Sequence, residues 1–197
     1  MSQENAFKHM KKTMFFFGIS FIISFYFLEV YIAQSVYGQE VDLSGSLFVF
    51  NLHDPLRFYG LPLFLSALNH TSWIHFITNT TLFIICSAYL EKWLSKKQWL
   101  WLLVLSHLFG TLICLIVFWL LLNNHDQYII GSSIIVFSFI GSLFYISKNK
   151  WLIWLVVIFC VGYYSLSASN TSALFTGIGH LAGFLFGYLF CYKLKIK

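Results

Sequence analysis

Charged side chains are scarce in this chain. Lys, Arg, Asp and Glu make up 10% of its 197 residues, whereas an ordinary soluble domain carries roughly 25%. Hydrophobic residues make up 59%. This balance excludes a soluble globular protein and indicates an integral membrane protein, with almost the whole length committed to one transmembrane domain.

The chain also lacks the patterns that hold a metal ion or a disulfide framework. It has no Cys-x-x-Cys pair, and His53, His107 and His125 do not have a metal-ligand spacing with each other. We expect His107 to bond to a neighbouring helix, and we expect no metal or other cofactor. All the cysteines stand in apolar stretches, where we interpret them as small core residues. They are Cys86, Cys114, Cys160 and Cys191.

Six apolar stretches approach the length of about 20 residues that a membrane-spanning helix needs. They predict an all-α polytopic membrane protein in which residues 13–192 form one six-helix domain. A cytoplasmic tail at 1–12 precedes this domain, a basic tail at 193–197 follows it, and residues 37–72 form a long outer loop. Because the loop is rich in Leu and Phe, we expect it to be ordered and to lie at or partly in the membrane interface. The predicted helices cover roughly residues 13–36, 73–94, 98–122, 130–147, 151–168 and 172–192.

Basic residues divide very unevenly between the two sides of this arrangement. With the N-terminus in the cytoplasm, 11 of the 12 basic residues fall on the cytoplasmic side, and only Arg57 falls outside. Such a bias sets the orientation of membrane proteins. The pattern predicts a multi-pass protein of the cell membrane with both termini in the cytoplasm. It also explains the net charge of +5 without a nucleic-acid partner. The richness in Phe, Ile, Lys and Asn favours a bacterial source.

Three apolar stretches, distant in the sequence, carry polar residues in the outer half of the predicted membrane. Ser133 opens one stretch, His180 lies inside another, and His75 and Asn79 share one face near the start of a third. Neutral imidazole can remove the proton of a serine hydroxyl during nucleophilic attack. His75, Asn79 and the N–H of Ser133 can donate hydrogen bonds to an oxyanion. The set predicts peptide-bond chemistry by a Ser-His dyad, since no carboxylate is available to orient His180.

Glycines recur every four residues around His180, so they line one face of the predicted helix. Such a face lets two helices pack closely in lipid. The stretch that begins at Ser133 offers Phe137 and Gly141 at the same spacing. If the two faces pack together, His180 can reach Ser133. The recurring glycines are Gly179, Gly183 and Gly187.

Several short motifs follow one another along the chain, namely His70-(x4)-His75-(x3)-Asn79, Leu90-Glu91-Lys92, Gly131-x-Ser133 and His180-x-x-Gly183-x-x-x-Gly187. Together they resemble the rhomboid family of intramembrane serine proteases over about residues 63–190. The resemblance implies that Ser133 is the nucleophile and His180 the base, and that His75, Asn79 and the Ser133 amide form the oxyanion site. It implies cleavage of transmembrane protein substrates near their outer ends, within the lipid bilayer and without metal or nucleotide. The supporting residues that it implies are His70, Gly131, Phe137, Gly183 and Gly187.

Two positions depart from the family pattern. Ile134 stands where the family usually has a glycine, and Phe137 stands where many relatives have a tyrosine. A β-branched residue beside the nucleophile could crowd the substrate. The alternative function is therefore a non-catalytic rhomboid-like protein that binds transmembrane partners. A transporter is disfavoured, because the two halves of the chain show no repeat.

Single residues also have structural interpretations. Ser132 is a rival of Ser133, and only the Gly-x-Ser spacing favours Ser133. His70 is more readily explained as a residue that anchors the outer loop than as a catalytic one. His75 and Asn79 could tie their helix to that loop, although the context favours the oxyanion role.

Overall fold

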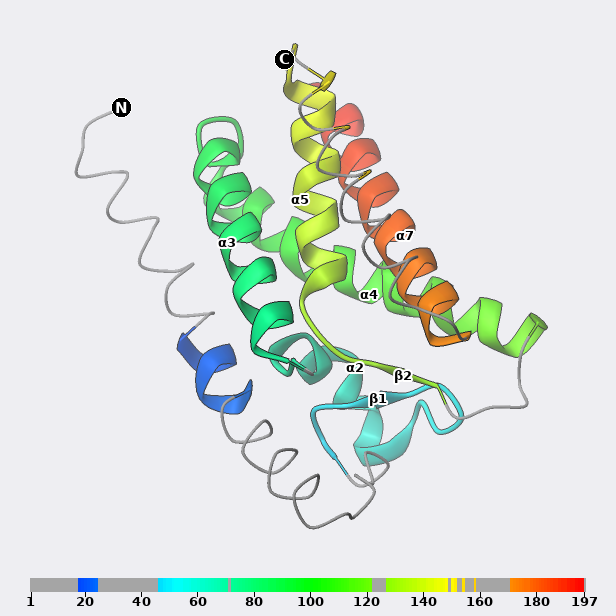
Figure 1. Ribbon diagram of the computed structural model, residues 1–197. Coiled ribbons are helices and arrows are strands. Elements are labelled where there is room, and N and C mark those ends of the chain that lie inside the picture. Colours follow the sequence, from blue (N-terminus) through cyan, green and yellow to red (C-terminus); the bar gives the residue numbers. More distant parts are fainter. Residues whose placement is uncertain are drawn as a thin grey trace.

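The computed structural model describes residues 18–24, 46–70, 72–121, 127–148, 150, 151, 154, 158 and 171–196 (Figure 1). Residues 18–24 are helical. The longest helices among the described residues are α3 (Trp73–Leu90), α4 (Lys96–Leu121), α5 (Ser133–Ile146) and α7 (Thr171–Lys193).

Three helices among the described residues are long and apolar enough to cross a membrane, and α5 is a shorter apolar helix. The prediction of a helical membrane protein is therefore confirmed. The predicted helix at 13–36 is described only at 18–24, and the one at 151–168 only at three residues, so both lie largely outside the described part of the chain. The three candidate spans are Trp73–Leu90, Lys96–Leu120 and Phe175–Lys193.

α5 is the central helix of the described bundle. Figure 1 shows it between α3 and α7 with α4 crossing behind, and it contacts all three. Every residue from Ser133 to Ser142 is buried. Its 14 residues extend about 21 Å, less than the roughly 30 Å of a bilayer's hydrocarbon core. A helix of this length cannot cross that core by itself, so a non-helical end inside the core would need the protein to satisfy its backbone.

The residues before α5 explain why this helix begins later than the predicted 130–147. Tyr128–Ile129 form strand β2, and Gly131 has a φ of +107°, in the left-handed region that favours glycine. The helix therefore starts only at Ser133.

α5 and α7 pack backbone against backbone. A Cβ added at Gly183 would collide with the carbonyl oxygen of Ile134, and one at Gly187 with that of Ser138. On the other helix, a Cβ at Gly141 would collide with the carbonyl of Phe184. The glycine face of α7 thus meets Ile134 and Ser138 of α5. Of the predicted row on α5, Gly141 contacts the backbone of α7 and Phe137 stacks on His180 of α7.

The described part of the loop predicted at 37–72 contains short ordered elements, in agreement with its apolar composition. Strand β1 (Phe50–Asn51) pairs antiparallel with β2, with Phe50 opposite Ile129 and Asn51 opposite Tyr128. The side chains of Val49, Phe50 and Leu52 are buried. The short helices that lead from this strand toward α3 are η2 (Arg57–Gly60), α2 (Pro62–Leu65) and η3 (Ser66–Leu68).

Side-chain caps set the first residues of α3 and α4. Ser72 Oγ accepts a hydrogen bond of 3.1 Å from the N–H of His75. Ser95 and Gln98 form a reciprocal pair, in which Gln98 N donates to Ser95 Oγ (3.3 Å) and Ser95 N donates to Gln98 Oε1 (2.8 Å). α4 therefore starts at Lys96, two residues before the apolar pattern suggests.

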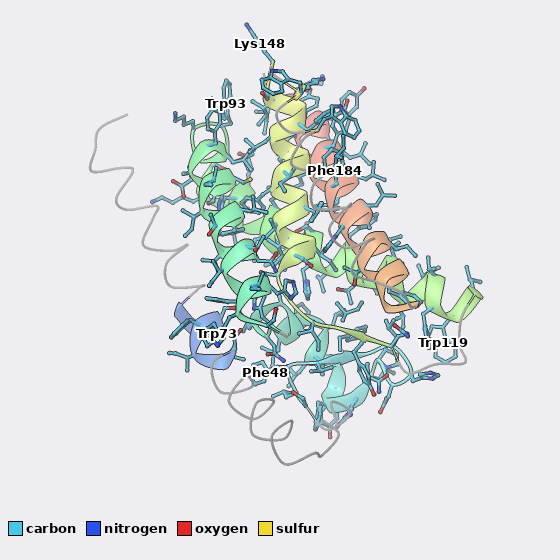
Figure 2. All side chains as sticks on the ribbon, viewed as in Figure 1. Phe48, Trp73, Trp93, Trp119, Lys148 and Phe184 are labelled. Atoms are coloured by element: carbon cyan, nitrogen blue, oxygen red, sulfur yellow. The ribbon has the colours of Figure 1, made fainter. Side chains whose placement is uncertain are left out.

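Different aromatic and basic residues lie at the two ends of the helix bundle. Figure 2 shows Trp93 and Lys148 at one end, and Trp73 and Phe48 at the other. The C-terminus lies at the same end as Lys148 (Figure 1). α5 begins, at Ser133, toward the end where Figure 2 labels Trp73.

The contact between α5 and α7 predicts a strong dependence of stability on Gly187. We expect Gly187→Ala to lower the free energy of unfolding by about 2 kcal/mol, because the added methyl group overpacks the contact with Ser138. Gly177→Ala is the matched control on the same helix, because no atom of the described residues lies within 4 Å of a Cβ at that position. Equilibrium unfolding in detergent micelles measures both. Equal stability of the two variants would contradict the packing described.

Candidate active site

Ser133 is the first residue of α5, and a tight approach of the preceding backbone sets its position. A Cβ at Gly131 would lie 2.8 Å from Cε1 of His75, so a larger residue would displace the imidazole. The N–H of Gly131 donates a hydrogen bond of 2.8 Å to the carbonyl of Ser66. The N–H groups of the first turn of a helix have no acceptor within the helix, and the helix dipole makes this end positive. The start of α5 is therefore suited to hold a negative charge.

His180 lies on α7 with its imidazole stacked on the ring of Phe137. The ring centroids are 4.1 Å apart and the planes differ by 8°. Phe137 is four residues after Ser133, so both lie on the same side of α5. His180 is 2% exposed, and it is close enough to His75 for an electrostatic interaction. The structure thus brings α3, α5 and α7 together around this imidazole.

Asn79 lies one turn after His75 on α3 and is 3% exposed. Among the described residues, its Nδ2 has no hydrogen-bond partner. A buried donor without an acceptor costs about 1–3 kcal/mol. An amide held in this way is available to donate to a group that enters the site.

His70 connects the residue before Ser133 to the first helical segment. Its Nε2 lies 3.1 Å from Ser132 Oγ, and its Nδ1 lies 3.1 Å from Ser24 Oγ and 3.5 Å from Ser20 Oγ. Ser20 and Ser24 donate their hydroxyl hydrogens to the carbonyl of Leu68, at 2.8 and 3.3 Å. Nδ1 of His70 is then the donor, and Nε2 accepts from Ser132.

This network separates the two neighbouring serines. Ser132 and His70 are both 0% exposed, and the Ser132 hydroxyl is already used by His70. Ser133 is 7% exposed, and no hydrogen bond to His70 holds it. The contacts of His70 match the loop-anchoring interpretation.

His107 on α4 supports the same region from a third side. Its Nε2 lies 3.3 Å from Ser66 Oγ in η3, the residue whose carbonyl accepts the N–H of Gly131. The sequence predicts a partner for His107 on a neighbouring helix but does not identify Ser66. Ser20 and Ser24 are further partners that the sequence does not single out, although their spacing of four residues is the signal of a shared polar face.

Burial should make His70 a source of acid sensitivity. The pKa of His70 is lowered from 6.5 to about 3; burial is the largest cause, the nearby His75 adds to the lowering, and a hydrogen bond with the Leu68 backbone opposes it. Because the pKa is lower in the folded than in the unfolded protein, His70 reduces stability progressively as pH falls below 6.5. We expect the resulting loss in the free energy of unfolding to reach about 3 kcal/mol at two pH units below 6.5.

The test compares the free energy of unfolding of wild type and His70→Asn at pH 7.5 and 4.5. The variant should be less stable at pH 7.5, because it loses the bonds to Ser132 and Ser24. The difference in the free energy of unfolding between wild type and variant should become smaller at pH 4.5. Phe76→Leu is the control, because Phe76 contacts the His70 ring edge-on at 5.3 Å without titrating. If the stability difference between wild type and His70→Asn stayed constant with pH, as we expect for Phe76→Leu, His70 would not be a source of acid sensitivity.

Comparison with known proteins adds an independent result. A family model described as a rhomboid domain matches residues 57–196. The search of curated proteins found no match. The matched region contains α3, α4, α5 and α7, and with them every candidate catalytic and oxyanion residue. Because the match covers 140 of the 197 residues, this chain belongs to the rhomboid family.

Proposed function

We propose that this protein is an intramembrane serine endopeptidase that cleaves transmembrane segments of membrane proteins near their outer ends. The observation that carries the proposal is the stacking of His180 on Phe137, one turn from Ser133, inside a buried three-helix contact. Family membership supports an intramembrane protease. A Ser-His dyad is the chemistry that these residues can perform.

In the proposed mechanism, Ser133 Oγ attacks the scissile carbonyl carbon while His180 takes up the hydroxyl proton. The carbonyl oxygen becomes an oxyanion, which the N–H of Ser133 and the side chains of His75 and Asn79 stabilise. The C–N bond then breaks, and His180 returns the proton to the leaving amine. Water, activated by His180, hydrolyses the acyl-enzyme. No step requires a metal or cofactor.

We also propose a multi-pass topology in the cell membrane with both termini in the cytoplasm. The distribution of charge supports it. Lys92 and Lys96 flank the turn between α3 and α4 at the Trp93 end, and Lys148 and Lys193 lie at the ends of α5 and α7. Arg57, the first residue of η2, is in the outer loop. This orientation puts Ser133 toward the outer side of the membrane.

The second candidate function is a non-catalytic relative that binds transmembrane partners, for which Ile134 is the motivating departure. Ile134 is 3% exposed and belongs to a buried cluster with Cys114, Phe118 and Phe175. A buried side chain does not project toward an approaching substrate, so the steric argument against catalysis loses force. This candidate predicts partner binding that survives Ser133→Ala, without proteolysis by the wild type.

The catalytic assignment can be tested with a fluorophosphonate probe on the purified protein in detergent. Ser133 Oγ displaces fluoride from phosphorus, and His180 accepts the serine proton. We expect labelling of wild type and none of Ser133→Ala or His180→Ala, with comparable loss because the two residues act as a unit. Ser132→Ala should still be labelled. Labelling that persists in Ser133→Ala, or that disappears only in Ser132→Ala, would contradict the assignment.

The oxyanion role of Asn79 predicts opposite effects on stability and activity. In Asn79→Leu, a buried donor without a partner is replaced by an apolar side chain of similar size, so the free energy of unfolding should stay equal or rise by about 1 kcal/mol. The cleavage rate of a transmembrane substrate in proteoliposomes should fall by about 100-fold or more, because one oxyanion donor is lost. Lower stability with unchanged cleavage would instead indicate a structural tie.

A further inference from the structure

Ile134 directly follows Ser133, and its side chain packs at the meeting point of three helices. A Cβ at Gly110 of α4 would lie 2.5 Å from Ile134 Cγ2. A Cβ at Gly179 of α7 would lie 3.3 Å from both Cγ1 and Cδ1 of Ile134. We call the space between these two glycines the Gly110–Gly179 notch. It accepts Ile134 only because neither helix has a side chain there.

The contacts around the notch leave α7 little freedom relative to α5. The same Cβ at Gly110 would lie 3.5 Å from the carbonyl oxygen of Gly179, so α4 and α7 approach each other at this level. The carbonyl oxygen of Ile134 lies against Gly183, one turn further along α7. Ile134 therefore contacts α7 through its side chain at one turn and through its backbone at the next, which opposes both rotation and sliding.

These contacts are adjacent in sequence to the two residues of the proposed dyad. Ser133 precedes Ile134, and Gly179 precedes His180. A rotation of α7 large enough to empty the notch would also move His180 off the ring of Phe137. Ile134, which stands where the family usually has a glycine, is thus accommodated by glycines on two other helices.

We propose that Ile134 is a positioning residue for catalysis, whose packing in the Gly110–Gly179 notch sets the orientation of His180 toward Ser133. The inference rests on the proposed protease function for its catalytic consequence. The packing itself stands on the geometry alone.

The test is a double-mutant cycle with Ile134→Ala, Gly110→Ala and the combined variant. Ile134→Ala empties the notch, and Gly110→Ala forces a methyl group against Ile134 Cγ2. Each single variant should lower the rate of fluorophosphonate labelling, per folded molecule, by about tenfold or more. In the combined variant the methyl group at 110 enters the space that Cγ2 leaves, so the rate should recover several-fold above either single variant. Ile134→Val, which keeps both γ carbons, should retain a rate within about threefold of wild type.

Ile135→Ala is the matched control. Ile135 is 1% exposed on the same helix, but it packs in a different cluster with Phe83, Leu90 and Phe139. It should cost comparable stability, leave the labelling rate of the folded protein within about twofold, and combine additively with Gly110→Ala. An equal loss of rate in Ile135→Ala and Ile134→Ala, or additive effects of Ile134→Ala and Gly110→Ala, would overturn the proposal.

A second measurement separates this inference from the proposed function. The ring current of Phe137 shifts the NMR signals of the His180 imidazole, whether or not the protein is an enzyme. Ile134→Ala should move these signals toward the values of Phe137→Leu, and Ile135→Ala should not. An unchanged His180 signal in Ile134→Ala overturns the positioning role. Folded wild type that is never labelled, with the His180 signal moved as expected, overturns the protease function and leaves Ile134 as a determinant of helix orientation only.

Discussion

The direct contact between the backbones of α5 and α7 is the constraint on which the rest of the structure depends. In lipid, helices gain little from hiding apolar side chains, so they associate through close packing and hydrogen bonds. Gly183 and Gly187 leave room for carbonyl groups of α5, and Ser142 Oγ donates to the carbonyl of Gly187 at 3.1 Å. The orientation of α7 that satisfies these contacts also stacks His180 on Phe137. The same packing of α7 on α5 therefore also determines the geometry around His180.

The short length of α5 creates a second requirement. Its first residue follows a non-helical stretch among buried residues, and buried backbone groups need hydrogen-bond partners within the protein. The pairing of β1 with β2 and the bond from Gly131 N–H to the carbonyl of Ser66 meet this requirement. They also hold the N–H groups at the start of α5 in place. A donor that must meet a developing oxyanion needs such a fixed position, because reorganisation during the reaction would reduce its effect.

Ser133 and its two neighbours in the sequence have different contacts, because successive side chains point in different directions. Ser132 faces His70 and the first helical segment, and Ile134 faces α4 and α7. Ser133, between them, is the one with measurable exposure among the two serines.

The sequence by itself determined the class of this protein, the approximate positions of α3, α4, α5 and α7, and the set of residues that resembles a rhomboid site, because apolar run length and motif spacing are local properties. The tertiary structure alone decided which side chains meet. No local pattern relates Ser20 and Ser24 to His70, or Gly110 to Ile134, because these partners are separated by tens of residues and join only when helices pack. The start of α5 at Ser133 also depended on the tertiary structure, since the pairing of Tyr128–Ile129 with β1 competes with helix formation. The consequence of Ile134 was decided in the same way, because whether an isoleucine crowds a site depends on what the opposing helices leave open.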